Sequence, residues 1–115
     1  MENILYLLSQ GFESSSIKTL EFKSFCKNFR HAFIKELKRY YDIECITFNY
    51  GHFYISGFFS LKDGRIFYFS IPDVRSPSDQ NRMLIRTAKS FKDYTGGSNN
   101  FITIKEDMFN FYQLP

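Results

Sequence analysis

The spacing of hydrophobic positions predicts helix in the first third of the chain. Residues 17–41 carry large apolar side chains at three- and four-residue intervals, a pattern typical of a long α-helix with one apolar stripe. Ser14–Ser16 precede this segment and can supply a hydroxyl group that caps the helix N-terminus. A shorter helical pattern over Glu2–Gln10, ending at Gly11, predicts a helix that lies over the core. The long stripe consists of Phe22, Phe25, Cys26, Phe29, Phe33, Leu37 and Tyr40.

The pattern then changes to the alternation of β-strands. Residues 43–71 contain three runs of β-branched and aromatic residues separated by two short breaks with glycine, which predicts an antiparallel meander. The second break allows two registers. A two-residue turn would pair Phe59 with Tyr68 and mix apolar with polar groups on both faces. A three-residue turn over 62–64, with its glycine left-handed in a bulge, pairs Phe59 with Phe67 and separates the faces, so we choose it.

In this register the sheet has one apolar face and one mixed face. The apolar face carries Phe53, Ile55, Gly57, Phe59, Leu61, Phe67, Phe69 and Ile71. The mixed face carries Tyr54, Ser56, Phe58, Ser60, Ile66, Tyr68 and Ser70. At the first break, a turn at residues 50–51 pairs Phe48 with Phe53. The same turn pairs Ile46 with Ile55, so Ile46 and Phe48 join the apolar face, on which the long helix should pack.

The remaining chain predicts one more hairpin and a last helix. Residues 72–79 are rich in turn formers and cannot lie in the middle of a sheet. Residues 81–88 fit both a strand and a helix; we choose a strand that pairs with 101–104. The segment 89–100 then forms a loop long enough to suggest a function.

Thr103 and Glu106 resemble a capping box, which predicts a C-terminal helix over 105–114. The apolar side chains that this helix should bury are Met108, Phe109 and Tyr112. The whole pattern predicts a single α+β domain over residues 1–115, with N-terminal helices packed on an antiparallel meander of four to five strands and a short C-terminal helix.

Composition narrows the class of protein. Aromatic residues make up 20% of the chain and none is Trp, so the core must be built largely from phenyl rings. The net charge of +3 permits contact with nucleic acid or an acidic protein surface and argues against an acidic mimic of DNA. No signal peptide precedes Cys26 and Cys45, and the longest apolar run, Ile4–Leu8, is too short to span a membrane. We therefore expect reduced cysteines in a cytoplasmic protein without membrane contact.

Two groups of polar residues are candidates for binding. Lys23, Lys27, Arg30 and Lys38 cluster on one side of the long helix, away from its apolar stripe. This side is either a solvated helix face or a surface for phosphates or acidic side chains. The second group lies between residues 73 and 100 and contains Asp73, Arg75, Arg86, Lys89, Asp93, Thr95, Gly96, Gly97 and Asn99.

The glycines of the second group can present backbone N–H groups as an anion-binding concavity, with Arg86 and Lys89 as counter-charge. The alternative is a plain turn, in which Asp73 and Asp93 tie the loop through salt bridges or Asx turns. The mixed sheet face offers a third possibility, because Tyr54, Phe58 and Tyr68 could stack nucleic-acid bases. We instead expect the C-terminal segment to cover them.

The residues that catalysis or metal binding would need are not found at recognisable spacings. Ser, Cys and His do not form a nucleophile, base and orienter set, and neither cysteine has metal-ligand spacing to a histidine. Dinucleotide fingerprints and paired carboxylate motifs are also missing. We therefore expect neither catalytic residues nor a cofactor.

Four stretches carry a pattern that is similar to a known group of proteins. They read GHFYISGFF (51–59), DVR (73–75, after Ser70), LIRTAK (84–89) and DYTGGSN (93–99). With these stretches the chain resembles a family of short, uncharacterised proteins of phages and integrative elements of low-GC Gram-positive bacteria. The resemblance covers about half the chain and implies a mobile-element setting without an assigned reaction.

This setting favours a non-enzymatic protein that binds and inhibits a host macromolecular machine, a host protein or ribonucleoprotein, with a CRISPR effector nuclease as the first candidate. The helix face Lys23–Lys38 and the loop Arg86–Asn100 would contact its acidic patch or its guide RNA. One alternative is an RNA or single-stranded DNA binding module. Another is a small enzyme for a phosphorylated substrate, with Asp73 or Asp93 as acid and base.

Overall fold

The computed structural model describes residues 19–51, 53–72, 74, 82–104, 108–111 and 113–115. The predicted helix over Glu2–Gln10 and the cap at Ser14–Ser16 lie outside them. The described helices are α2 (Thr19–Tyr40) and α3 (Met108–Phe111). The strands are β1 (Ile43–Tyr50), β2 (Ile55–Leu61), β3 (Ile66–Ile71), β4 (Arg82–Thr87) and β5 (Asn100–Thr103). The predicted α+β class is therefore confirmed.

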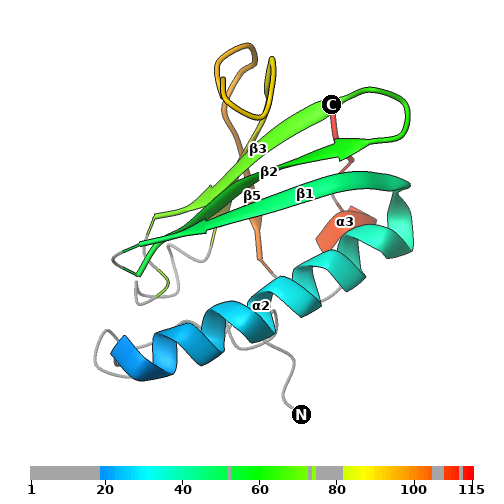
Figure 1. The fold of residues 1–115 in the computed structure, drawn as a ribbon. Coiled ribbons are helices and arrows are strands. Elements are labelled where there is room, and N and C mark those ends of the chain that lie inside the picture. The colour runs from blue at the N-terminus through cyan, green and yellow to red at the C-terminus, as the bar shows by residue number, and fades with distance from the viewer. Residues whose placement is uncertain (1–18, 52, 73, 75–81, 105–107, 112) are drawn as a thin grey trace.

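The five strands form one antiparallel sheet in the order β1-β2-β3-β4-β5, so every strand pairs with its neighbour in sequence. α2 and α3 lie on one face of this sheet, while the loop that joins β4 to β5 stands on the opposite face (Figure 1). We call the second side the outer face. Its strand positions are Cys45, Thr47, Asn49, Ser56, Phe58, Ser60, Ile66, Tyr68, Ser70, Arg82, Leu84, Arg86, Phe101 and Thr103. Within the described chain, neither helix is long and apolar enough to cross a membrane.

The core lies between α2 and the sheet. Phe is the most common residue of its described part, and aliphatic side chains such as Ile55 and Ile85 fill the space between the rings. Phe33 is fully buried at its centre. Its ring centroid lies 4.8 Å from that of Phe69 on β3, 6.3 Å from Phe59 on β2 and 6.2 Å from Phe109 on α3. One side chain of α2 thus joins two strands and the C-terminal helix.

The register of β2 and β3 confirms the three-residue turn. Phe59 pairs with Phe67, and Gly64 has a φ of 96°, which a residue with a Cβ rarely adopts. The Leu61 amide donates to the Arg65 carbonyl oxygen at 2.9 Å and closes the turn. The apolar and mixed faces therefore separate as expected.

The predicted register of β1 and β2 is wrong. Ile46 pairs with Phe59 rather than Ile55, and Phe48 pairs with Gly57 rather than Phe53. The connection is longer than two residues, because Phe53 has a φ of 61° and cannot continue a strand. Its ring is instead buried against Phe22 at a centroid distance of 5.0 Å. The slip covers an even number of residues, so Ile46 and Phe48 still pack against the core as predicted.

The choice of a strand for residues 81–88 is confirmed by β4, which pairs with β5. Met108 and Phe109 are buried as predicted, whereas Tyr112 lies outside the described residues. The expectation that the C-terminal segment covers the outer face is wrong. The Phe109 ring meets Phe33 and, at 6.0 Å, Tyr41, both on the α2 side of the sheet.

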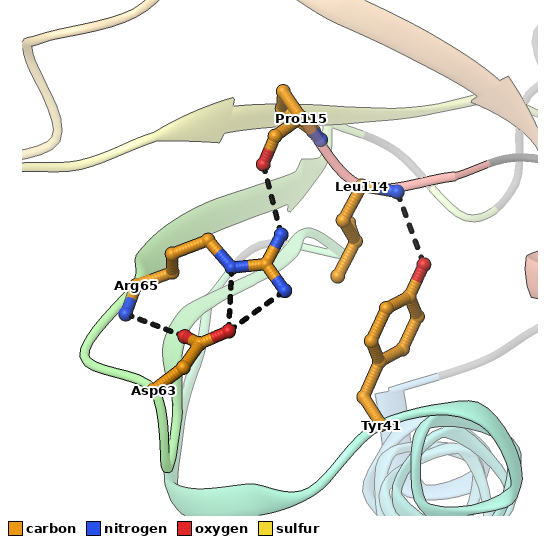
Figure 2. Close-up of polar contacts among 5 residues, drawn as sticks. All are labelled: Tyr41, Asp63, Arg65, Leu114 and Pro115. Carbon is orange, nitrogen blue, oxygen red and sulfur yellow. Dashed lines mark hydrogen bonds and ion pairs between the residues drawn. The ribbon is translucent and has the colours of Figure 1, made fainter.

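The last residues are fixed to the β2–β3 turn and to the end of α2 (Figure 2). Arg65 forms an ion pair of 2.9 Å with Asp63 and donates to the Pro115 carbonyl oxygen at 3.1 Å. The Leu114 amide donates to the Tyr41 hydroxyl oxygen at 3.0 Å. These contacts hold the C-terminal residues against the side of the core that α2 covers.

Truncating Phe33 should destabilise the fold more than truncating an exposed ring. Phe33→Ala leaves a cavity where three elements meet, so the free energy of unfolding should fall by about 3–5 kcal/mol. Phe101→Ala, at a side chain 58% exposed, should change it by less than about 0.5 kcal/mol. Urea denaturation followed by circular dichroism measures both values. Equal losses would show that the core is not centred on Phe33.

Candidate binding surface

A pocket of about 420 Å³ opens between the N-terminal half of α2 and the end of β1. We call it the α2 pocket. The residues that line it are Phe22, Lys23, Cys26, Lys27, Arg30 and Tyr50. Three of the four predicted basic residues of the helix therefore come together around one hollow. The fourth, Lys38, is exposed farther along α2 and does not line the pocket.

Helix geometry explains this combination of side chains. Lys23, Lys27 and Arg30 follow one another at four- and three-residue intervals, which places them on one side of α2. Phe22 and Cys26 lie at the neighbouring positions, on the edge of the buried stripe, and both are buried. The pocket therefore has an apolar base and a cationic rim.

Aromatic residues of β1 position the third cation. The Arg30 guanidinium carbon lies 5.3 Å from the centroid of the Phe48 ring, and Phe48 stacks on Tyr50 at 6.1 Å. A guanidinium group over an aromatic face is held by cation–π attraction. Arg30 is thereby kept at the boundary between helix and strand.

The described residues that line the pocket carry positive charge and no carboxylate. Burial raises the pKa of the Cys26 thiol to about 12, so the thiol is neutral at physiological pH. Burial, together with the nearby Cys26, also raises the pKa of the Tyr50 phenol, against an opposing effect of Arg30. No ion pair links Lys23 or Lys27 to any described residue. Lys23, Lys27 and Arg30 therefore give this part of the described surface a positive charge.

In the second predicted group, between residues 73 and 100, the side chain of Arg86 is bonded to the backbone of the β4–β5 loop. Arg86 Nη2 donates a hydrogen bond of 2.7 Å to the Gly97 carbonyl oxygen. A Cβ atom at Gly97 would come within 3.1 Å of the Thr87 backbone nitrogen and oxygen, so any other residue here would have to push the loop slightly away from β4. The Gly96-Gly97 pair thus has a packing role in addition to the predicted anion site, which stays a prediction.

The rest of the loop is tied by short-range bonds. The Asp93 carboxylate accepts hydrogen bonds from the Thr95 amide, at 3.0 Å, and from the Thr95 hydroxyl. The Lys89 amide donates to the Asp93 carbonyl oxygen at 3.1 Å. The Asx turn that the sequence offered as an alternative is therefore present. Lys89 and Asn99 are exposed, whereas Asp73 and Arg75 lie outside the described residues.

This loop, and not the C-terminal segment, covers part of the outer face. The Phe91 ring stacks on Phe58 at 5.7 Å, and the Tyr94 ring lies 5.2 Å from that of Tyr68. Phe58 is buried, so it is not the base-stacking platform that the sequence suggested, while Tyr54 is 38% exposed.

Sequence reasoning missed Tyr50 and Cys26 as lining residues of the α2 pocket. The position of Cys26 between the apolar and basic stripes was a usable signal. No local signal marks Tyr50, because its place beside α2 depends on the β1–β2 register.

Comparison with known proteins adds no family. No protein-family model, curated protein or solved structure matches the chain. Among the described residues, no group of three or more His, Cys, Asp or Glu side chains could hold a metal ion.

The two cysteines are unpaired, as expected, and should react at very different rates. Cys45 is exposed, whereas Cys26 is buried with a raised pKa and offers almost no thiolate. A thiol-reactive chromophore at pH 8 should label one thiol per folded chain and two after unfolding in guanidinium. Cys45→Ser should abolish the labelling of the folded chain. Rapid labelling of two thiols would contradict the burial of Cys26.

The Asp93 turn should respond to acid. The Thr95 hydroxyl and amide, in that order, hold the pKa of the Asp93 carboxyl below its ordinary value of 3.8. Because the folded-state pKa is lowered, the turn contributes stability above the ordinary pKa and loses it as the pH falls through the lowered one.

The Asp93 carboxyl signal in an NMR titration measures this pKa. We expect a midpoint below 3.8 in the native chain and a higher one in Thr95→Val, which lacks the hydroxyl donor. The same midpoint in both proteins would show that Thr95 does not hold the carboxylate.

Proposed function

We propose that the chain is a non-enzymatic binding protein of a phage or mobile element that inhibits a host macromolecular machine by covering one of its surfaces. A CRISPR effector nuclease is the first candidate, and such a target would place the protein in the cytoplasm of a bacterial host. The observation that carries the proposal is the α2 pocket, in which Lys23, Lys27 and Arg30 surround an apolar base.

The chemistry of the pocket supports a protein partner. A cationic rim attracts acidic side chains over distances of about 8–10 Å at physiological salt. The buried base of Phe22 and Cys26 can take an apolar side chain, which a bare phosphate backbone does not offer. The partner would thus present an apolar residue flanked by carboxylates. Burying one such anchor at the centre of an interface can supply much of the binding energy.

The enzyme alternative has less support. Its acid and base were Asp73 or Asp93, and the Asp93 carboxylate is already bonded to Thr95 with a lowered pKa. A general acid or base works best with a pKa near the operating pH. The Cys26 thiol is protonated at physiological pH and so is a poor nucleophile. Both groups therefore fit a structural role better than a catalytic one.

Charge reversal in the pocket tests the proposal directly. Lys27→Glu places a negative charge at the centre of the cationic rim and should repel an acidic partner, weakening inhibition by at least about tenfold. Lys62→Glu makes the same change in net charge at an exposed position of the β2–β3 turn, beside the C-terminal end of α2, and should have little effect. Both variants should keep the native circular dichroism spectrum.

The measurement is DNA cleavage by a purified CRISPR effector ribonucleoprotein at increasing concentrations of each protein. A parallel affinity capture from host lysate, read by mass spectrometry, covers other host machines. Equal activity of the two variants would rule out the α2 pocket as the contact surface. Capture of nothing above background by the native chain, together with unaltered cleavage, would overturn the proposed function.

A further inference from the structure

The outer face of the sheet exposes two large aromatic rings. Phe101 is 58% exposed and Tyr94 is 53% exposed, more than any other large hydrophobic side chain of the described residues. Phe101 lies on β5 opposite Leu84 of β4, and Tyr94 stands on Tyr68 of β3. The sequence did not single out either residue, because the outer-face position of Phe101 follows only from the β4–β5 register.

Both rings are held in place by the fold. Tyr94 packs on Tyr68 at 5.2 Å, and Tyr68 packs in turn on Phe58, also at 5.2 Å. Phe91 stacks on the same Phe58 ring, so the loop that carries Tyr94 is anchored at two points. The pairing of β5 with β4 fixes the backbone of Phe101. A ligand that stacks on these rings would lose little free energy to ordering them.

Each exposed ring has an arginine beside it. The Arg82 guanidinium carbon lies 5.6 Å from the Phe101 centroid, and that of Arg86 lies 5.8 Å from the Tyr94 centroid. Arg82 is exposed, whereas Arg86 is fixed by its bond to Gly97. The outer-face positions of β2 to β5 carry no carboxylate. The face therefore combines flat aromatic surfaces with positive charge.

The register also places the rings close enough for one ligand to reach both. Phe101 lies beside Leu84, and Arg86, next to Tyr94, is two residues farther along β4. Two residues along a strand span about 7 Å, so Phe101 and the Arg86 that contacts Tyr94 occupy adjacent rows of the sheet, with Arg82 in the row on the other side of Phe101.

We propose that the outer face of β4 and β5 binds single-stranded nucleic acid, with bases stacked on Tyr94 and Phe101 and a phosphate held by Arg82. Sheet-borne aromatics with neighbouring cations bind unpaired bases in this way in several nucleic-acid binding modules. An acidic peptide fits less well, because exposed aromatic rings offer stacking surfaces that suit the flat faces of bases. This site lies on the opposite side of the sheet from the α2 pocket.

The test is fluorescence anisotropy with the full chain and three labelled probes: a 12-nucleotide RNA, a 12-nucleotide DNA strand and a DNA duplex of the same length. We expect both single strands to bind more tightly than the duplex. Phe101→Ala and Tyr94→Ala should each weaken binding by roughly 5- to 150-fold. Phe101→Tyr keeps a stacking ring and should bind like the native chain. Arg82→Ala should reduce the slope of log affinity against log salt by about one.

Lys27→Glu separates this proposal from the proposed function. It should leave strand binding within about twofold, since Lys27 is on the far side of the sheet, while Phe101→Ala should leave any α2-pocket contact intact.

Three results would overturn the proposal. They are no anisotropy change at low salt, undiminished binding by Phe101→Ala, and equal competition by polyglutamate, which would indicate an acidic protein partner. If the native chain sediments as a dimer and Phe101→Ala as a monomer, the face instead binds a second copy of the chain.

Discussion

The contact between Phe33 and the sheet is the constraint on which the rest of the structure depends. Its ring packs against Phe69, Phe59 and Phe109, so the rotation of α2 about its own axis is fixed by one residue and its neighbours in the stripe. A helix with one side fixed in this way must present its other sides outward. The outward position of Lys27, and hence the rim of the α2 pocket, follows from this packing.

The two faces of the sheet differ in how far their apolar side chains are covered. On the core face, α2 and α3 exclude water from a layer of phenyl rings. On the outer face, the β4–β5 loop packs on Phe58 and Tyr68, while Tyr94, Phe101 and Arg82 remain exposed. The loop remains in place because Arg86 binds its Gly97 carbonyl oxygen and Asp93 closes a turn within it. A segment with the composition of an anion site is thus also a structural clamp.

The sequence alone determined the elements, most of the faces and the basic stripe. Periods of 3.6 and 2 residues are local properties of the chain, so the length of α2 and the β2–β3 register could be predicted, whereas residues 81–88 fitted both periods and the strand there was a choice between them. Lys23, Lys27 and Arg30 could be placed together because helix geometry alone decides their spacing. Even the wrong β1–β2 register preserved the faces, since a slip of an even number of residues keeps side-chain parity.

Only the tertiary structure decided how these pieces meet. The left-handed Phe53 lengthens the first turn because its ring can be buried against Phe22, a contact between distant residues that no local pattern encodes. The place of Tyr50 in the α2 pocket also depends on contacts between residues distant in sequence. The same holds for the position of the C-terminal helix on the α2 side of the core. The exposure of Phe101 likewise depends on which segments compete to cover the outer face. That competition is settled by packing across the whole chain, whereas the elements themselves are settled by neighbours a few residues apart.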